Sequence, residues 1–295
     1  MQKHLLTVCF FCLFAAITAF RAFSQPEKDI PVHSRPIVFI HGLFQNNHSW
    51  GNWKTYFEDR GFTVYAPSYP FHDGDPAYLR QYPDSGLVTL EFDQVLDHFN
   101  RMIDSLPVKP IVIGHSMGGL LMQKLIESER AFMGIGLAPA NPRGVSTADW
   151  RYFRSNFRMV NPLRSRNKVC RPPLRWFRYT FFNTLPDSLA SREYANYFVP
   201  ESRRIAKSST GKKQAINFSK PHAPMLFVAG ENDNDLPPSL IFNNYKAYTD
   251  PNSVRQYHQF PGKSHYLAGE PGWELVADYL HQWILQTATP SPVQD

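Results

Sequence analysis

The chain has 295 residues, of which 43% are hydrophobic and 15% aromatic, and its formal net charge at pH 7 is +6. This apolar content excludes a disordered chain, and the length suits one large α/β domain or two small domains. The charge is uneven. Residues 141–217 hold 16 Lys or Arg against 4 Asp or Glu, whereas the rest of the chain holds 15 Lys or Arg against 21 Asp or Glu. This asymmetry predicts an inserted segment with its own surface chemistry.

The first residues predict an export signal. Lys3 and His4 precede an apolar run at 5–20, and small residues at 22 and 24 fit the pattern that signal peptidase reads. A run of about 16 apolar residues is short for a membrane span, which needs roughly 20, so we favour cleavage of residues 1–24 over an uncleaved anchor. The predicted location is periplasmic or secreted.

Cysteine usage agrees with this prediction. Cys9 and Cys12 lie in the predicted signal, which leaves Cys170 alone in the mature chain. An intramolecular disulfide and a metal site built from cysteines are therefore both excluded.

Short apolar runs bounded by Gly and Pro alternate with helical patterns, which is typical of βα units on a parallel sheet. The predicted strands are, in chain order, 37–40, 63–65, 111–113, 133–137, 225–228 and 254–260. The predicted helices are 50–60, 89–106, 120–128, 237–248 and 273–285. Because most of these apolar runs are continuous rather than alternating, we expect strands that are buried on both faces.

The basic segment interrupts this rhythm between the fourth and fifth strands. It is predicted to be a mostly helical insertion at 141–220, between core parts at 25–140 and 221–287, with a flexible tail at 288–295. In one interpretation its aromatic residues line an acyl pocket and its arginines face an anionic substrate or a phospholipid surface. In the other, which we favour, the aromatic residues form the insertion's own core and the arginines a solvated face.

The strongest signal for chemistry is P-I-V-I-G-H-S-M-G-G at 110–119. Here G-x-S-x-G follows a buried strand and precedes a helical pattern, so the serine hydroxyl is expected on a sharp turn above the sheet edge. Ser116 is the predicted nucleophile. The N–H of Met117, at the start of the helix, is a predicted oxyanion donor. The alternative is a purely structural turn.

A second loop, F-I-H-G-L-F at 39–44, follows the first predicted strand. Folds with a strand-to-helix serine turn supply their second oxyanion N–H from such a loop. Leu43 is the predicted donor, and Phe44 is the next candidate. The alternative is a glycine loop with a solvent-facing His41.

A serine hydroxyl needs a base to take its proton, and eleven histidines compete for that role. His258 lies in a predicted strand and His281 in the last predicted helix, where packing is the expected role. His265 lies in a loop after the last strand, at the same sheet edge as Ser116, and is the predicted base.

The orienting acid is expected between serine and histidine in chain order. The acidic turn after the strand at 225–228 offers Asp233 and Asp235. Spacing alone does not separate them, and either also suits a turn or a helix cap.

Together these elements resemble the α/β-hydrolase superfamily over residues 35–287. In that family the late strand is followed by G-x-x-D-x-x-x-P, which Gly230, Asp233 and Pro237 match, so the resemblance favours Asp233 over Asp235. It implies a mostly parallel central sheet flanked by helices, with the insertion at the lid position. The sequence resembles lysophospholipase-like and esterase-like members of the family. The H-G-G-G loop of some lipases is absent, and Ser116 argues against members with an aspartate nucleophile.

The expected reaction is hydrolysis of a carboxylic ester through an acyl-enzyme, with Ser116, His265 and Asp233 as the triad and Leu43 and Met117 as oxyanion donors. It requires no cofactor and no metal. The alternatives are a perhydrolase or haloperoxidase-like enzyme, an amide or carbon–carbon bond hydrolase with the same triad, and a non-catalytic binding protein on this scaffold. The expected partner is a small acyl ester, and nucleic acid is not expected because no recognition module is present.

Overall fold

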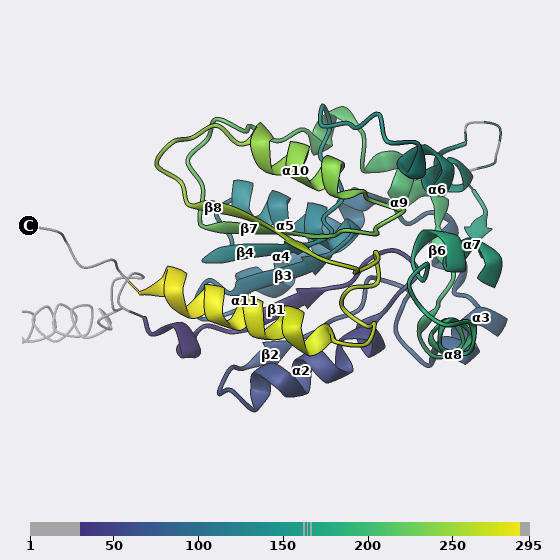
Figure 1. Ribbon diagram of the computed structural model, residues 1–295, viewed down its shortest axis with the longest axis horizontal. Coiled ribbons are helices and arrows are strands. Elements are labelled where there is room, and N and C mark those ends of the chain that lie inside the picture. Colours follow the sequence, from purple (N-terminus) through teal and green to yellow (C-terminus); the bar gives the residue numbers. More distant parts are fainter. Residues whose placement is uncertain (1–29, 162, 164, 166, 290–295) are drawn as a thin grey trace, which may run out of the picture.

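Figure 1 shows the computed structural model of the protein, which describes residues 30–161, 163, 165 and 167–289. The predicted export signal at 1–24 and most of the predicted tail at 288–295 lie outside the described residues. Within the described ranges, no helix combines the length and the apolar character needed to cross a membrane.

A six-stranded sheet runs through the molecule, and all of its neighbouring strands are parallel. In spatial order the strands are β2 (Val64–Tyr65), β1 (Ile37–Ile40), β3 (Ile111–His115), β4 (Met133–Leu137), β7 (Met225–Gly230) and β8 (Arg255–Phe260). Every residue of β1, β3, β4 and β7 is buried, whereas the edge strand β8 is only partly buried. The continuous apolar runs therefore form the strands that are covered on both faces.

Helices cover both faces of this sheet (Figure 1). One face packs against α4 (Phe92–Asp104), α5 (Met117–Glu127) and α10 (Pro238–Ala247). The other face packs against α2 (Gly51–Glu58) and α11 (Trp273–Ala288). The 3-10 turn η2 (Val32–Ser34) precedes β1, and the connections contain α3 (Pro76–Gln81) and the 3-10 turns η3 (Asn47–Trp50) and η4 (Ser85–Val88). The molecule thus has the predicted architecture of a mostly parallel central sheet flanked by helices.

The segment between β4 and β7 forms a separate group of elements at the carboxyl end of the strands, on the right of Figure 1. Its helices are α6 (Trp150–Val160), α7 (Leu174–Thr180), α8 (Asp187–Tyr197) and α9 (Arg203–Ser208), followed by the 3-10 turn η5 (Lys212–Gln214). Two short antiparallel strands, β5 (Val169–Cys170) and β6 (Glu201–Ser202), pair within it. Helices are therefore the main regular secondary structure of this segment, although they hold fewer than half of its residues.

An aromatic cluster joins the insertion to the rest of the fold. Phe177, Phe181 and Phe182 of the insertion pack there with Phe44 from the loop after β1 and Tyr266 from the loop after β8. Other aromatic residues of the insertion lie outside this cluster and are exposed, namely Trp150, Phe153 and Phe157. The aromatic residues of the insertion are therefore divided between an internal core and the surface.

Candidate active site

Ser116 lies between β3 and α5 on a strained turn. Its φ of 54° and ψ of −118° lie outside the regions that L residues favour, at a usual cost of about 1–3 kcal/mol. Its N–H donates to Leu137 O at 2.9 Å, and its carbonyl accepts from Ala140 N at 2.8 Å. The chain at the end of β4 therefore holds the strained serine in place at the carboxyl edge of the sheet.

Glycines allow three backbone segments to meet at this turn. A Cβ on Gly118 would lie 2.1 Å from Ile40 O, and a Cβ on Gly114 would lie 2.1 Å from Gly118 O. A Cβ on Gly42, in the loop after β1, would lie 2.9 Å from the Cβ of Ser116. The loop after β1 is therefore in direct contact with the serine turn.

The two predicted oxyanion donors have no competing acceptor. In the described part of the chain, the N–H groups of Leu43 and of Met117, the first residue of α5, donate to no protein atom. Phe44 differs, because its N–H donates to a carboxylate oxygen of Glu201 at 3.2 Å. Phe44, the second candidate donor in the sequence, is therefore already engaged.

Glu201 connects the insertion to the loop after β1. Besides Phe44 N, its carboxylate lies 3.2 Å from His72 Nε2, and both side chains are buried. Burial alone would lower the pKa of His72, but the charge and the hydrogen bond of Glu201 raise it. The sequence gives no signal for this contact, since 157 positions separate Phe44 from Glu201.

His265 and Asp233 meet at the same edge of the sheet. His265 Nδ1 lies 2.8 Å from Asp233 Oδ2, and Asp233 Oδ1 accepts the N–H groups of Asp235 and Leu236 at 2.7 and 2.8 Å. Because a carboxylate with these partners is held as an acceptor, His265 carries a proton on Nδ1 and keeps Nε2 for chemistry. Nε2 is buried and has no hydrogen-bond partner, Ser116 included, among the described residues.

Gly230 brings the loops that carry this pair together. A Cβ at Gly230 would lie 2.5 Å from Ser264 O, directly before His265 in the chain. The loop after β7 is also bonded to the loop after β8, because Asn232 N donates to Lys263 O at 2.8 Å. The glycine of the G-x-x-D pattern therefore has a packing reason that its spacing alone does not reveal.

Asp235 approaches the other nitrogen of the same histidine. Its Oδ2 lies 3.5 Å from His265 Nε2, and its Oδ1 accepts from Asn156 Nδ2 of α6 at 3.1 Å. Burial raises the pKa of the Asp235 carboxyl to about 7, although His265 opposes the shift. The distances separate two aspartates that sequence spacing left equal, since Asp233 contacts Nδ1 and Asp235 faces Nε2.

The pKa of His265 lies above its usual value. Burial alone would lower it, but the charge and hydrogen bond of Asp233 and the charge of Asp235 raise it. The two carboxylates therefore favour the protonated form of the His265 imidazole.

His115, the variable residue of G-x-S-x-G, has a structural role that the motif does not predict. Burial, together with the charge of His265, lowers the pKa of His115 to about 3. The ring is therefore neutral, and its Nε2–H donates to the backbone carbonyl of His265 at 2.9 Å. His115 thus fixes the loop that carries His265.

His41 is buried rather than facing solvent. Its Nδ1–H donates to Gly42 O at 2.8 Å, and its Nε2 accepts from Tyr69 N at 3.0 Å. Burial, with the charge of His72, lowers its pKa well below the usual value, so it stays neutral. His41 therefore braces the loop that carries Leu43.

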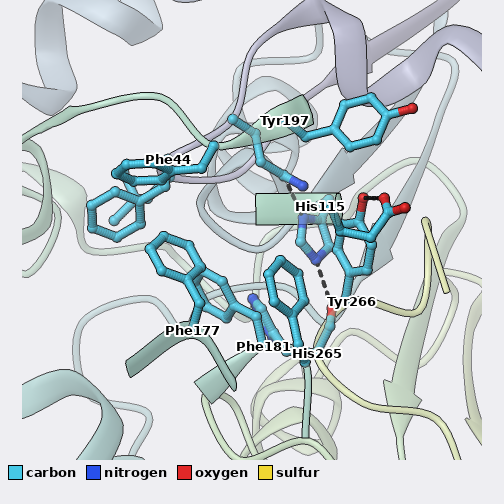
Figure 2. Close-up of a pocket in the computed structure, with 12 residues that line it drawn as sticks. Phe44, His115, Phe177, Phe181, Tyr197, His265 and Tyr266 are labelled. Atoms are coloured by element: carbon cyan, nitrogen blue, oxygen red, sulfur yellow. Dashed lines mark hydrogen bonds between the residues drawn. The ribbon is translucent and has the colours of Figure 1, made fainter. Parts of the chain in front are cut away.

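The pocket beside His265 contains little free space. Its free volume is about 20 Å³, little more than the roughly 10–15 Å³ that a water needs. Phe181 of the insertion stacks on His265 with a centroid distance of 4.9 Å. Figure 2 shows Phe44 and Phe177 on one side of this pocket and His115, Tyr197 and Tyr266 on the other. A larger cavity of about 280 Å³ shares the wall formed by Glu193, Tyr197 and Tyr266.

This arrangement combines groups suited to acyl transfer: a strained serine, an oriented imidazole and uncommitted N–H groups. Within the described ranges, no group of three or more His, Cys, Asp or Glu side chains is placed to hold a metal ion. A serine, a histidine and an aspartate therefore lie together at the carboxyl edge of the sheet, and these are the side-chain types that acyl transfer uses.

A family model described as the alpha/beta hydrolase family matches residues 37–278. Solved structures with a similar fold include the monoacylglycerol lipase of Paleococcus ferrophilus, at 18% identity and a TM-score of 0.59, covering 86% of this chain and 96% of that one. A methylesterase from Arabidopsis matches at 16% identity with a TM-score of 0.61, covering 85% of this chain and 99% of that one. Tomato methylketone synthase I complexed with 2-tridecanone matches at 17% identity with a TM-score of 0.63, covering 86% of this chain and 99% of that one. No curated protein matches the chain significantly.

Proposed function

The chain belongs to the alpha/beta hydrolase family, and from that premise we propose that it is a serine hydrolase that cleaves a carboxylic ester. Ester-cleaving enzymes are among its structural neighbours, which supports a hydrolase in general. At identities of 16–18% these neighbours share the fold and carry no information on substrate. The assignment of the reaction therefore rests on the site itself.

In the proposed reaction, Ser116 Oγ attacks the acyl carbonyl while His265 Nε2 takes its proton. The N–H groups of Leu43 and Met117 stabilise the oxyanion, each contributing about 10²–10³ in rate. His265 then protonates the leaving alcohol, and water releases the acyl group from Ser116 by the same steps. Asp233 keeps the His265 proton on Nδ1 throughout.

The observation that carries the proposal is the 2.8 Å contact between His265 Nδ1 and Asp233 Oδ2, at the sheet edge where Ser116 is held on a strained turn. A histidine with only a packing role does not need an oriented carboxylate at Nδ1 and a second nitrogen left without a hydrogen bond. Closing the gap between Nε2 and Ser116 requires a rearrangement on substrate binding, which is common for catalytic hydrogen bonds.

The test is hydrolysis of p-nitrophenyl esters from acetyl to palmitoyl by the parent chain and by Ser116→Ala. We expect turnover by the parent and a loss of about 10⁴-fold or more in kcat/KM for the variant. The matched control is Ser188→Ala, which removes an exposed hydroxyl from the insertion and should keep full activity.

Two further results decide the outcome. Covalent labelling of Ser116 by a fluorophosphonate, located by mass spectrometry, would support the nucleophile even if no ester of the panel fits the pocket. An unlabelled parent that is inactive on every ester would instead favour a non-catalytic binding protein. Equal activity of Ser116→Ala and the parent would refute the proposed triad.

A further inference from the structure

The outer face of α6 exposes large aromatic side chains to solvent. Trp150, Phe153 and Phe157 have exposed fractions of 71%, 48% and 62%. Their spacing of three and then four residues places them on one face of a helix. Leu163, shortly beyond the helix, is 92% exposed. We call these three aromatic residues the α6 stripe.

The opposite face of α6 is firmly anchored, so the exposure of the stripe is built into the fold. Ser155 Oγ donates to Asn234 O at 2.7 Å, and Asn156 Nδ2 donates to both the carbonyl and the carboxylate of Asp235 at 3.1 Å. Met159 is buried in the aromatic cluster of the insertion. Turning the stripe inward would break all of these contacts.

The insertion that carries the stripe is rich in exposed cationic side chains. Arg154, next to the stripe on α6, is exposed, with its guanidinium 3.8 Å from the centroid of the Tyr179 ring. Further exposed cationic side chains of the insertion are Arg143, Lys168, Arg171 and Arg175.

The four acidic residues of 141–217 do little to neutralise this charge. Asp149 pairs with Arg151, and Asp187 pairs with Arg178. Glu193 and Glu201 are buried. Asp187 is therefore the one exposed acidic residue of 141–217, and the exposed cationic side chains of this segment outnumber it.

We propose that the α6 stripe docks on a membrane surface that contains anionic phospholipid. Aromatic side chains favour the boundary between headgroups and acyl chains, and neighbouring arginines bind lipid phosphate. A second copy of the chain suits the surface less well, because it would bring two basic faces together. An isolated exposed aromatic residue is ordinary, but three on one face of a helix that also exposes Arg154, in a basic segment, are the composition of an interfacial helix.

Docking through α6 would also place the candidate active site near the lipid. The anchored face of α6 contacts Asn234 and Asp235, which directly follow Asp233 in the chain. The docking itself does not depend on the proposed reaction, so it can be tested without any activity measurement.

The experiment is flotation of the chain lacking residues 1–24, because that apolar segment would itself bind lipid. Vesicles of phosphatidylcholine alone are compared with vesicles that also contain phosphatidylglycerol, at low and high salt. We expect binding to the anionic vesicles at low salt that weakens as salt is added. Joint replacement of Trp150, Phe153 and Phe157 by Ser should lower the partition coefficient about tenfold or more.

A matched control replaces three exposed apolar residues elsewhere, Phe242, Val254 and Leu275, by Ser and should bind as the parent does. Circular dichroism and thermal unfolding verify that both triple variants are folded. Lipids brominated near the headgroup should quench the fluorescence of the parent more than that of Trp150→Phe.

Three results would overturn the proposal. The first is a parent that does not float with anionic vesicles at low salt. The second is a stripe variant that floats as well as the parent. The third is a parent dimer in sedimentation experiments that the stripe variant dissociates while vesicle binding is unchanged, which would assign the stripe to a second copy of the chain.

Discussion

The sheet and the insertion use apolar residues in different ways. In β1, β3, β4 and β7 every residue is buried, and both faces of the sheet are covered by helices. In the insertion, chemically similar side chains have opposite environments: Phe177 is 2% exposed and Phe157 is 62% exposed. The sheet holds Ser116 in a strained position, whereas the insertion lines the pocket with aromatic rings. We therefore expect the sheet to keep the site rigid, and the insertion to govern entry into the pocket and contact with the surroundings.

The largest expected effect concerns Asp233, the proposed acid of the triad. Asp233→Asn should lower kcat by about 10⁴-fold, because an amide at this position favours the wrong tautomer of His265. Asp235→Asn, two residues away and also beside the imidazole, should keep most of the activity. Steady-state kinetics of the two variants measure the contrast. A larger loss for Asp235→Asn would reverse the assignment of the two aspartates.

Rigidity of the serine turn is tested by adding one methyl group. Gly118→Ala would place a Cβ 2.1 Å from the backbone oxygen of Ile40, which cannot move without disturbing β1. We expect the free energy of unfolding to fall by about 3 kcal/mol in urea titrations. Gly51→Ala is the control, because a Cβ there meets nothing within 4 Å, and it should be neutral or stabilising by about 0.5 kcal/mol. Equal free energies of unfolding for the two variants would show that the serine turn can accommodate a methyl group at Gly118.

Access of a reagent to Ser116 is tested at Phe181, whose ring is stacked on the imidazole of His265. Phe181→Ala removes the side chain stacked on His265 and should raise the rate of fluorophosphonate labelling at Ser116 by roughly tenfold, at some cost in stability. Phe153→Ala, on the outer face of the insertion, is the control and should label at the parental rate. If Phe181→Ala labels no faster than the parent, the ring does not limit entry.

The smallest expected effect is on pH dependence. Burial would lower the pKa of His265, but the carboxylates of Asp233 and Asp235 raise it, so kcat/KM should fall as pH decreases through a midpoint above about 6.5. Replacing Asp235 by Asn removes one of the two charges, so the midpoint should move to lower pH. A profile of Asp235→Asn that overlays the parental profile would mean that Asp235 does not influence the imidazole.

The sequence predicts the sheet well because burial on both faces leaves an unmistakable pattern. Continuous apolar runs mark β1, β3, β4 and β7, and the strand-to-helix position of G-x-S-x-G locates the turn of Ser116. Helix α5 begins at Met117, three residues before the predicted start at 120, because Gly118 and Gly119 weaken the helical pattern while serving close packing.

The site was less predictable where it depends on contacts between distant segments. Spacing could not rank Asp233 and Asp235, and only the two distances to the imidazole separate them. The bonds from Phe44 to Glu201 and from His115 to the backbone of His265 join residues 157 and 150 positions apart. No local pattern encodes such pairs, and none tells an inward aromatic residue of the insertion from an outward one.

Cys170 gives the protein an internal reporter of local opening. Its side chain is 1% exposed, on β5 within the aromatic cluster that covers the pocket. Without residues 1–24 the chain has no other thiol. The rate at which a thiol reagent modifies Cys170 under native conditions therefore counts excursions in which this cluster loosens while the sheet stays folded. Comparing that rate with the rate of global unfolding would give the free energy of such a sub-global opening without any introduced probe.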